Sequence, residues 1–516
     1  MTRIFHVLLS AIVGLSAIGG TAQVNSHRVI PIPNQPFAQP VPKFIGSPAV
    51  AQPIQTTPVP QSPYMAPNGR SELHTDDYQS DTYPFAGPLG NSPQVTSTFL
   101  AAECGTVTFD SLGRIIVVCI GPVRPVVHLM DPNSLETLAT YNLPARGGVS
   151  GNFGSGGYFF LDNQDRAVIP TRGRDIYRIK ENAQGTGFAL DHTCKNSLPG
   201  MIPADQAINS VIPDDHGLLW FTTSGGSDLQ AEPAMVGTVN PDPNNMDNCT
   251  VKLFTLPKRE QIVKSLGADP DPSRGGVFIV STYQMYRFDP AADGTPTVTW
   301  HETYDRGTGV KPGQRYQGSG TTPTLVGTDM VTINNNADVQ THVVVYQRAA
   351  KITGPRRVCS VPVFQRGLSD SFNSLIATDS SILIENNYGY LDLKSTILGK
   401  TTEPGIARVD LNQDRNGCST VWTNTEEHVP NVVSQASLTT GLVYTYSKDP
   451  SPSNARFTDP WYFTAVDFHT GKTVFKVLAG TGVFYNSNYS GLYLGPDGKT
   501  GYVGVVGGLV RIHDAD

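Results

Sequence analysis

A recurring four-strand unit is the feature that most constrains the fold of this chain. In the clearest copy, residues 106–110 end in an aspartate, and two further strands are expected at 115–120 and 126–131. Similar units are found around 209–222 and 502–514. A four-strand unit repeated about every 40 to 60 residues is typical of a β-propeller. The sequence therefore predicts an all-β protein, a single β-propeller of eight four-stranded blades, with seven as the alternative.

The last predicted unit stops after three strands, at the end of the sequence given. A propeller that stayed open would leave unpaired strand edges. We therefore expect a strand from near residues 94–98 to supply the missing outer strand and close the ring. The fourth unit, around 276–300, is the least regular, which keeps the count of seven blades open.

The chain before the propeller divides into two segments. Residues 1–22 carry the pattern of a secretory signal peptide: Arg3, an apolar run at 4–18 and small residues at 20–22. Residues 23–98 are rich in proline, which disfavours helices and central strands. We expect residues 23–98 to form a disordered leader and residues 99–516 to form the propeller domain.

Composition limits the partners of the chain. A formal charge of −7 with 16% charged residues argues against nucleic acid, which would require a basic face. No lysine and arginine cluster would hold the chain on anionic lipid. After signal cleavage we expect a monomer, secreted or periplasmic, that is not inserted in a membrane and does not bind nucleic acid.

The six cysteines support export, because an even count in an exported chain suggests disulfides. Cys104 and Cys119 flank the first two strands of the first unit and could be bridged within one blade. The other four fall in the outer-strand regions of successive units. Bridges between adjacent blades are therefore favoured, joining Cys194 with Cys249 and Cys359 with Cys418. Other pairings stay open, because six cysteines allow several connectivities.

Common catalytic motifs are absent from the sequence, and the histidines show no zinc-ligand spacing. Residues 209–225, however, resemble the Asn…Asp-x-x-Gly-x-Leu-Trp-Phe-Thr unit of gluconolactonase-type and streptogramin-lyase-type propellers. The whole array, with Gly-Pro-Asp-Gly at 495–498, also resembles quinoprotein-dehydrogenase-like propellers. The resemblance covers residues 99–516, and its motifs specify the blade more than the reaction.

The gluconolactonase resemblance implies a divalent ion, usually calcium, on the propeller axis. It points to Glu103, Asn209 and Asn373 as metal ligands, and oxygen ligands of this kind suit Ca²⁺. Glu103 stands in Glu-Cys-Gly where the family usually has Glu-Gly-Pro, and the terminal Asp of the family has no clear counterpart. The alternative is that these side chains hydrogen-bond neighbouring backbone.

The quinoprotein resemblance implies a quinone-dependent dehydrogenase. That family's tryptophan-docking repeats and pair of adjacent cysteines are both missing here. Quinone-dependent oxidation is therefore the weaker alternative.

Polar stretches rich in Asn and Tyr border the apolar strands near 385–390 and 485–489. On one face of the ring they would supply donors, acceptors and flat rings without net charge, which suits a small polar or carbohydrate-like ligand. The candidate binding residues are Asn386, Asn387, Tyr388, Tyr485 and Asn488. Ordinary turn chemistry is the alternative.

Glu385 ends an apolar strand beside two amides, and it is the candidate catalytic residue. Burial would raise the pKa of its carboxyl group and suit it to general-base catalysis. Two functions follow from the sequence. The first is a calcium-dependent, lactonase-like hydrolase with its site on the axis. The alternative is a propeller that binds a ligand or a protein without catalysis, and the sequence does not decide between them.

Overall fold

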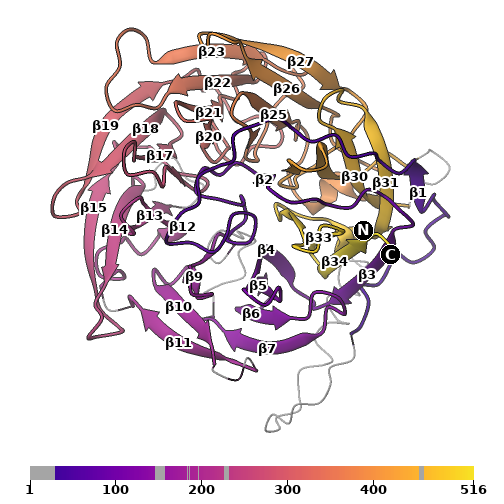
Figure 1. Cartoon of the computed structure of the whole chain (residues 1–516), viewed down its shortest axis with the longest axis horizontal. Helices are drawn as coiled ribbons and strands as arrows, with labels where there is room; N and C mark the ends of the chain where they lie inside the picture. The colour runs from indigo at the N-terminus through magenta and orange to yellow at the C-terminus, as the bar shows by residue number, and fades with distance from the viewer. Residues whose placement is uncertain are drawn as a thin grey trace.

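Eight four-stranded sheets surround a central axis in the computed structural model (Figure 1). The structure describes residues 29–145, 157–182, 184, 186–195, 197–225, 232–451 and 458–515. The predicted signal peptide lies outside the described residues. The prediction of a single propeller with eight blades is confirmed.

Within each blade, successive strands pair antiparallel from the axis outward. Blades 1 and 2 contain β4 (Glu103–Phe109), β5 (Ile115–Ile120), β6 (Pro125–Met130), β7 (Thr137–Asn142), β8 (Phe160–Leu161), β9 (Ala167–Pro170), β10 (Ile176–Glu181) and β11 (Phe188–Thr193). Blades 3 and 4 contain β12 (Ala207–Pro213), β13 (Leu219–Ser224), β14 (Met235–Pro241), β15 (Cys249–Thr255), β16 (Gly267–Ala268), β17 (Val277–Val280), β18 (Gln284–Pro290) and β19 (Pro296–Thr303).

The second half of the ring repeats this order. Blades 5 and 6 contain β20 (Thr324–Val326), β21 (Met330–Asn334), β22 (His342–Gln347), β23 (Arg357–Pro362), β24 (Ile376–Ala377), β25 (Ser381–Glu385), β26 (Ile406–Leu411) and β27 (Cys418–Asn424). Blades 7 and 8 contain β28 (Gln435–Ser437), β29 (Leu442–Ser447), β30 (Pro460–Asp467), β31 (Thr473–Thr481), β32 (Leu492–Leu494), β33 (Thr500–Val505), β34 (Gly508–His513) and β3 (Gln94–Phe99). The described residues also contain the 3₁₀ helices η1 (Leu393–Thr396) and η3 (Val483–Tyr485).

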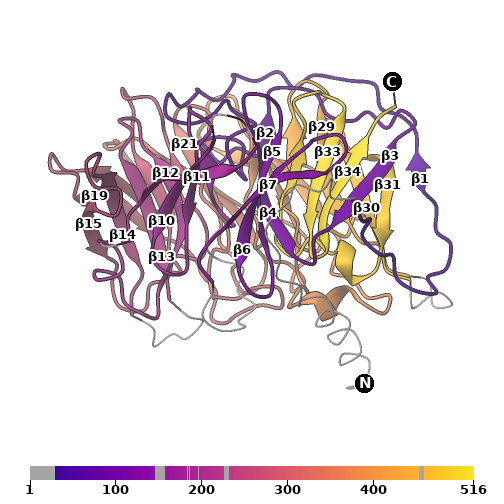
Figure 2. The same ribbon diagram turned by 90° about the horizontal axis from the view of Figure 1, so that it is seen from below.

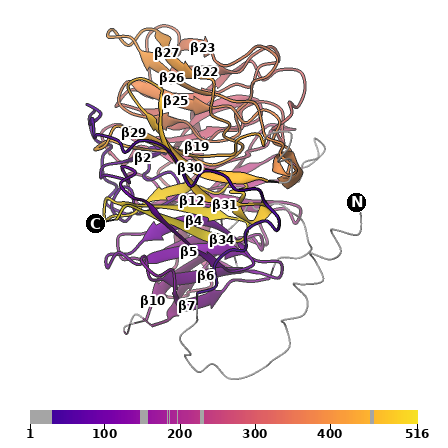
Figure 3. The same cartoon turned by 90° about the vertical axis from the view of Figure 1, so that its right-hand side faces the viewer.

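Strand β3 closes the ring, as predicted. It pairs with β34 over its whole length, from Gln94 opposite His513 to Phe99 opposite Gly508. The last blade therefore takes its outer strand from the start of the ring. Figure 3 shows this last blade beside β4 of the first blade, and β33 contacts β4 directly. Closure leaves no open edge between the first and last blades.

Burial follows the position of a strand in its blade. Strand β5 reads Ile-Ile-Val-Val-Cys-Ile and is buried throughout, because neighbouring blades cover both of its faces. The outer strand β7 alternates between half-buried and exposed residues, because only one of its faces meets the protein. This difference explains why inner strands read as continuous apolar runs and outer strands as mixed ones.

The aspartate that ends each clear inner strand builds the following turn. Asp110 Oδ1 accepts hydrogen bonds from the backbone N–H groups of Leu112 (2.9 Å) and Arg114 (2.8 Å). Arg114 Nε then donates to Asp110 Oδ2 at 2.8 Å. Asp162 and Arg166 repeat the arrangement in the next blade. The repeated aspartate is therefore a turn residue.

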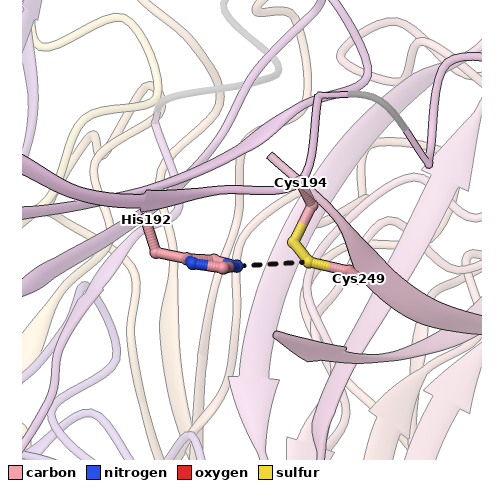
Figure 4. A group of neighbouring side chains, drawn as sticks. All are labelled: His192, Cys194 and Cys249. Atoms are coloured by element: carbon pink, nitrogen blue, oxygen red, sulfur yellow. Dashed lines mark hydrogen bonds between the residues drawn. A yellow bond between two sulfur atoms is a disulfide. The ribbon is translucent and has the colours of Figure 1, made fainter. Parts of the chain in front are cut away.

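Three disulfides join the pairs favoured by the sequence. Cys104–Cys119 links two strands of blade 1, and the other two bridges join outer regions of adjacent blades. His192 Nε2 lies 3.5 Å from Cys249 Sγ (Figure 4). Because Cys249 is bonded to Cys194, these sulfurs are not thiolates that could hold a metal.

Residues 29–98, here called the N-terminal strap, differ from the expected disordered leader because they pack on the propeller. Strand β1 (Phe44–Gly46) adds to the outer edge of blade 7, and β2 (Thr82–Tyr83) adds to its inner edge. Figure 2 shows the strap lying along one face of the ring. All residues from 71 to 83 are buried. The prediction of disorder is therefore wrong for this part of the chain.

The strap circles the axis between residues 70 and 83. Its backbone oxygens accept hydrogen bonds from backbone N–H groups of inner strands in six blades. Arg70 accepts from blade 1, Ser71 from blade 2, Asp77 from blade 4, Tyr78 from blade 5, Ser80 from blade 6, and Asp81 and Tyr83 accept from blade 7. The strap thereby covers the end of the axial channel where inner strands such as β4 finish.

The strap and the ring contain no predicted bilayer span. Among the described residues, no helix is long and apolar enough to cross a membrane.

Candidate functional site

A cavity of about 170 Å³ lies on the axis, among the first residues of the inner strands. Glu103 starts β4 of blade 1, and Asn209 lies near the start of β12 of blade 3. Lys264 precedes the inner strand of blade 4, and Asn488 precedes that of blade 8. Leu73 of the strap also lines the cavity. Since the strap covers the opposite ends of the inner strands, the cavity faces away from it.

Lys264 is the most unusual group in this cavity. Its Nζ lies 4.3 Å from the ring centroid of Phe372 and 5.1 Å from that of Tyr489. No hydrogen bond or ion pair joins this ammonium to any residue in the described part of the chain. The side chain is only 9% exposed. Its charge is therefore stabilised by two aromatic faces and by no carboxylate.

Burial, together with a smaller contribution from repulsion by Arg315, lowers the pKa of Lys264 to about 7. An unperturbed lysine is fully charged at neutral pH. Lys264 is therefore divided between its ammonium and its neutral amine near pH 7. A desolvated lysine of this kind can act as a base, a nucleophile or a switchable cation.

The charged groups around the cavity are mostly positive. Arg172, Lys264 and Arg315 line it together with the carboxylates of Glu103 and Asp205. Asp205 is exposed at the rim, whereas Lys264 and Glu103 are buried. The Arg315 guanidinium carbon lies 5.0 Å from the Tyr489 ring centroid, so it shares an aromatic neighbour with Lys264. The lining thus carries three cationic groups against two carboxylates, one of which lies at the exposed rim.

Asn488 and Tyr489 enter the cavity from a strained backbone. Their φ angles are 41° and 72°, in the left-handed region that bulky residues rarely adopt. Side-chain hydrogen bonds hold Asn488 in place: Tyr390 Oη donates to its Oδ1 at 2.8 Å, and its Nδ2 donates to Glu103 Oε2 at 2.9 Å. Strain of this kind occurs where surrounding structure positions a functional group.

The structure brings three of the predicted site residues together. Glu103, Asn209 and Asn488 all line the axial cavity. The remaining predicted site residues are not among its lining residues: Asn373, Glu385, Asn386, Asn387, Tyr388 and Tyr485.

The predicted calcium ligands fit a divalent cation poorly. Asn373 lies outside the cavity lining and donates from Nδ2 to the Val432 oxygen at 2.6 Å. Asn209 Oδ1 already accepts a hydrogen bond from Ser224 Oγ at 2.9 Å. Lys264 lies in the same cavity and would repel Ca²⁺. We therefore derive no calcium-dependent step, and calcium binding stays a prediction.

Glu385 is buried at the end of β25, between blades 6 and 7. Its Oε1 accepts a hydrogen bond from the Ser434 N–H at 3.3 Å, while its Oε2 has no partner among the described residues. Burial raises the pKa of this carboxyl group well above its usual value, as the sequence argument expected. The group nevertheless lies away from the lining of the axial cavity.

The Asn and Tyr residues near 386–388 and 485 mostly bond neighbouring backbone. Asn386 donates to the oxygens of Leu368 and Pro404, and Asn387 donates to that of Val429. Tyr485 Oη donates to the Ile32 oxygen of the strap at 2.9 Å. Tyr388 is half-buried. These contacts fit the turn and packing alternative for Asn386, Asn387 and Tyr485.

Sequence reasoning missed Lys264 and Arg315, and it named the stretch near 485–489 without selecting Tyr489. The signal for Lys264 was a single lysine within the mostly apolar residues 261–268. That stretch contains β16, an inner strand of only two residues. Arg315 lies in a loop before blade 5, and no periodic pattern marks it.

Comparisons with known proteins find weak similarity to solved structures and none to known sequences. No family model and no curated protein sequence matches this chain. Among solved structures, BamB from Moraxella catarrhalis matches with 12% identity, a TM-score of 0.45, and coverage of 84% of this chain and 96% of that one. A candidate 6-phosphogluconolactonase from Bacteroides fragilis matches with 10% identity, a TM-score of 0.38, and coverage of 74% of this chain and 96% of that one. The WD40 domain of SCAP from fission yeast matches with 9% identity, a TM-score of 0.42, and coverage of 82% of this chain and 94% of that one. The eight sheets around one axis establish that this chain is a β-propeller.

Proposed function

We propose that this protein is an exported propeller that binds a small polar ligand bearing a carboxylate, such as a sugar acid, in its axial cavity. The observation that carries the proposal is the Lys264 ammonium, which is buried in the cavity without a carboxylate partner among the described residues. A bound anion would supply that partner. Charge-assisted hydrogen bonds of this type contribute about 1.5 to 3 kcal/mol each.

The neutral groups of the cavity suit the rest of such a ligand. Tyr158, Tyr316 and Tyr489 provide aromatic faces, and Asn209 and Asn488 provide amides. Aromatic rings with a few convergent polar groups are the usual lining of a site for a polar organic molecule. The volume of about 170 Å³ limits the ligand to a small molecule.

Export is part of the proposal, with a secreted or periplasmic location. Three disulfides support it, because structural disulfides persist in oxidising compartments. The signal-peptide pattern of residues 1–22 supports it as well.

Calorimetric titration with gluconate and with sorbitol tests the proposal. The two probes differ in one carboxylate group, so their affinities isolate the charge. We expect gluconate to bind about ten- to a hundredfold more tightly, corresponding to one charge-assisted contact. Arg415→Gln, which removes a cation remote from the cavity, is the control variant. Equal affinity for both probes, or no binding of either, would contradict the proposal.

The lactonase-like hydrolase is the second candidate, because Glu103 and Asn209 do line one cavity. It requires metal, so the test is the calcium content of the purified protein together with its melting temperature with and without EDTA. Stoichiometric calcium and a lower melting temperature after chelation would favour this candidate and justify a screen of lactones. An unchanged melting temperature would favour the anion-binding propeller.

A further inference from the structure

We infer that Lys264 forms a reversible covalent imine with the carbonyl carbon of a small oxo acid held in the axial cavity. This inference rests on the proposed function, since the cavity must first accept the carboxylate. Its geometric basis is the position of Lys264, which is buried, lines the axial cavity and places Nζ 4.3 Å from the ring centroid of Phe372 and 5.1 Å from that of Tyr489.

The other buried lysines in the described part of the chain, Lys448 and Lys476, and the half-buried Lys311 are engaged elsewhere. Lys448 forms an ion pair with Asp459 at 3.1 Å, and Lys476 forms one with Glu427 at 2.9 Å. Lys311 donates to the Ser369 oxygen at 2.8 Å. A lysine in an ion pair must break it before its nitrogen lone pair can react. Lys264 makes no such contact within the described structure.

The environment of Lys264 favours its neutral form. Arg315 repels the ammonium, and burial removes the water that would stabilise its charge. With a pKa of about 7, the neutral fraction at pH 7 is roughly a thousandfold larger than that of an unperturbed lysine. Only the neutral amine is a nucleophile, and lysines activated in this way form imines with carbonyl compounds.

The reaction balances without a redox partner. The Lys264 nitrogen attacks the carbonyl carbon, and the carbonyl electron pair moves to the oxygen. The oxygen then leaves as water with the two hydrogens of the amine, and a carbon–nitrogen double bond remains. Water reverses the step.

Two further cations in the cavity favour an oxo acid as the carbonyl compound that reacts with Lys264. Arg315 and Arg172 line the same cavity and can hold the carboxylate while the carbonyl meets Nζ. The Tyr489 ring lies against Lys264 Nζ. Burial raises the pKa of Tyr489 to about 12, which keeps its phenol protonated. Fixing both groups of one small molecule raises the effective concentration of carbonyl at the amine.

Reductive trapping tests the inference. The intact protein is incubated with pyruvate and sodium borohydride at pH 8, and the modified lysine is located by peptide mass spectrometry. Lactate with borohydride is the matched ligand control, because lactate carries the carboxylate without the ketone. We expect Lys264 to be labelled by pyruvate at least about tenfold more than any other lysine, in line with its larger neutral fraction. No label is expected with lactate.

Lys264→Arg separates this inference from the proposed function. Arginine forms no imine, so trapping at position 264 should disappear in this variant. Binding of the carboxylate is measured separately on the wild-type protein, by calorimetry with pyruvate and with lactate. Binding of both acids to the wild-type protein with even labelling of surface lysines, or with no labelling, would overturn the imine alone. If neither acid binds, both the imine and the anion site are wrong.

Discussion

Replacement of Lys264 by methionine should stabilise the ligand-free protein, and the gain should depend on pH. Burial lowers the pKa of Lys264 from 10.5 to about 7. Because one pKa unit corresponds to about 1.4 kcal/mol, the charged lysine costs the folded state about 5 kcal/mol below pH 7. Methionine keeps an apolar stem between Phe372 and Tyr489 and carries no charge. Because the pKa shift already includes every interaction of the ammonium, the expected gain below pH 7 is about 5 kcal/mol.

The sign of the pH dependence follows from proton binding. Between pH 7 and 10.5 the unfolded chain keeps the lysine proton and the folded chain releases it. The free energy of unfolding of the wild-type protein therefore rises with pH in this window, by about 1.4 kcal/mol per pH unit from this residue. The Lys264→Met variant lacks this contribution. Its advantage should shrink from about 5 kcal/mol at pH 6 to about 2 kcal/mol at pH 9, because the unfolded chain still keeps the lysine proton at pH 9.

Urea unfolding followed by tryptophan fluorescence, at pH 6 and pH 9 with the disulfides intact, measures both values. Lys351→Met is the control, because Lys351 is exposed and its removal should change neither value. A gain of the same size at both pH values would show that it does not come from the charge of Lys264. A loss of stability at pH 6 would refute the premise that the folded protein pays to bury this ammonium.

Three further predictions concern the acid groups of the strap, the disulfides and the ligand. Burial raises the pKa of Asp77 well above 3.8 and that of Asp76 to about 7. The free energy of unfolding should therefore fall as pH rises from about 4 through 7, and Asp77→Asn should make this fall smaller in urea unfolding. Replacing Cys359 and Cys418 by alanine opens a loop of 59 residues and should lower the free energy of unfolding by about 4 kcal/mol, measured in the same way. Gluconate affinity should fall by roughly tenfold or more between pH 7 and pH 9 as Lys264 loses its proton, while Lys264→Arg should show no such fall in calorimetry.

The blades could be predicted from sequence because their signals are local. An apolar run such as Ile115–Ile120 marks a covered strand, and Asp110 marks the turn before it. Closure by Gln94–Phe99 followed from the missing strand of the last blade. The irregular fourth unit also has a local cause: its inner strand, Gly267–Ala268, is too short to give a pattern.

The strap was wrongly predicted to be disordered because each proline lacks a backbone N–H donor but keeps its carbonyl oxygen as an acceptor. Pro42 and Pro88 contribute their oxygens to the hydroxyls of Tyr462 (3.1 Å) and Tyr444 (2.9 Å). The strap as a whole offers carbonyl oxygens to inner-strand N–H groups around the axis. A segment held largely through its carbonyl oxygens needs no regular donor pattern, so composition alone does not distinguish it from a disordered leader.

The same contacts explain how the strap and the cavity depend on each other. In an open propeller channel, water can reach a charged side chain from both ends, so the charge costs the folded state little free energy. Here residues 70–83 cover one end, and Leu73 reaches the cavity lining. Burial of Lys264 lowers its pKa, together with repulsion from Arg315. A strap that closes one end of the channel favours such burial. A ligand anion would restore the stabilisation that the strap removes. The strap is thus as much a part of the proposed site as the inner strands, although it contributes little to the lining itself.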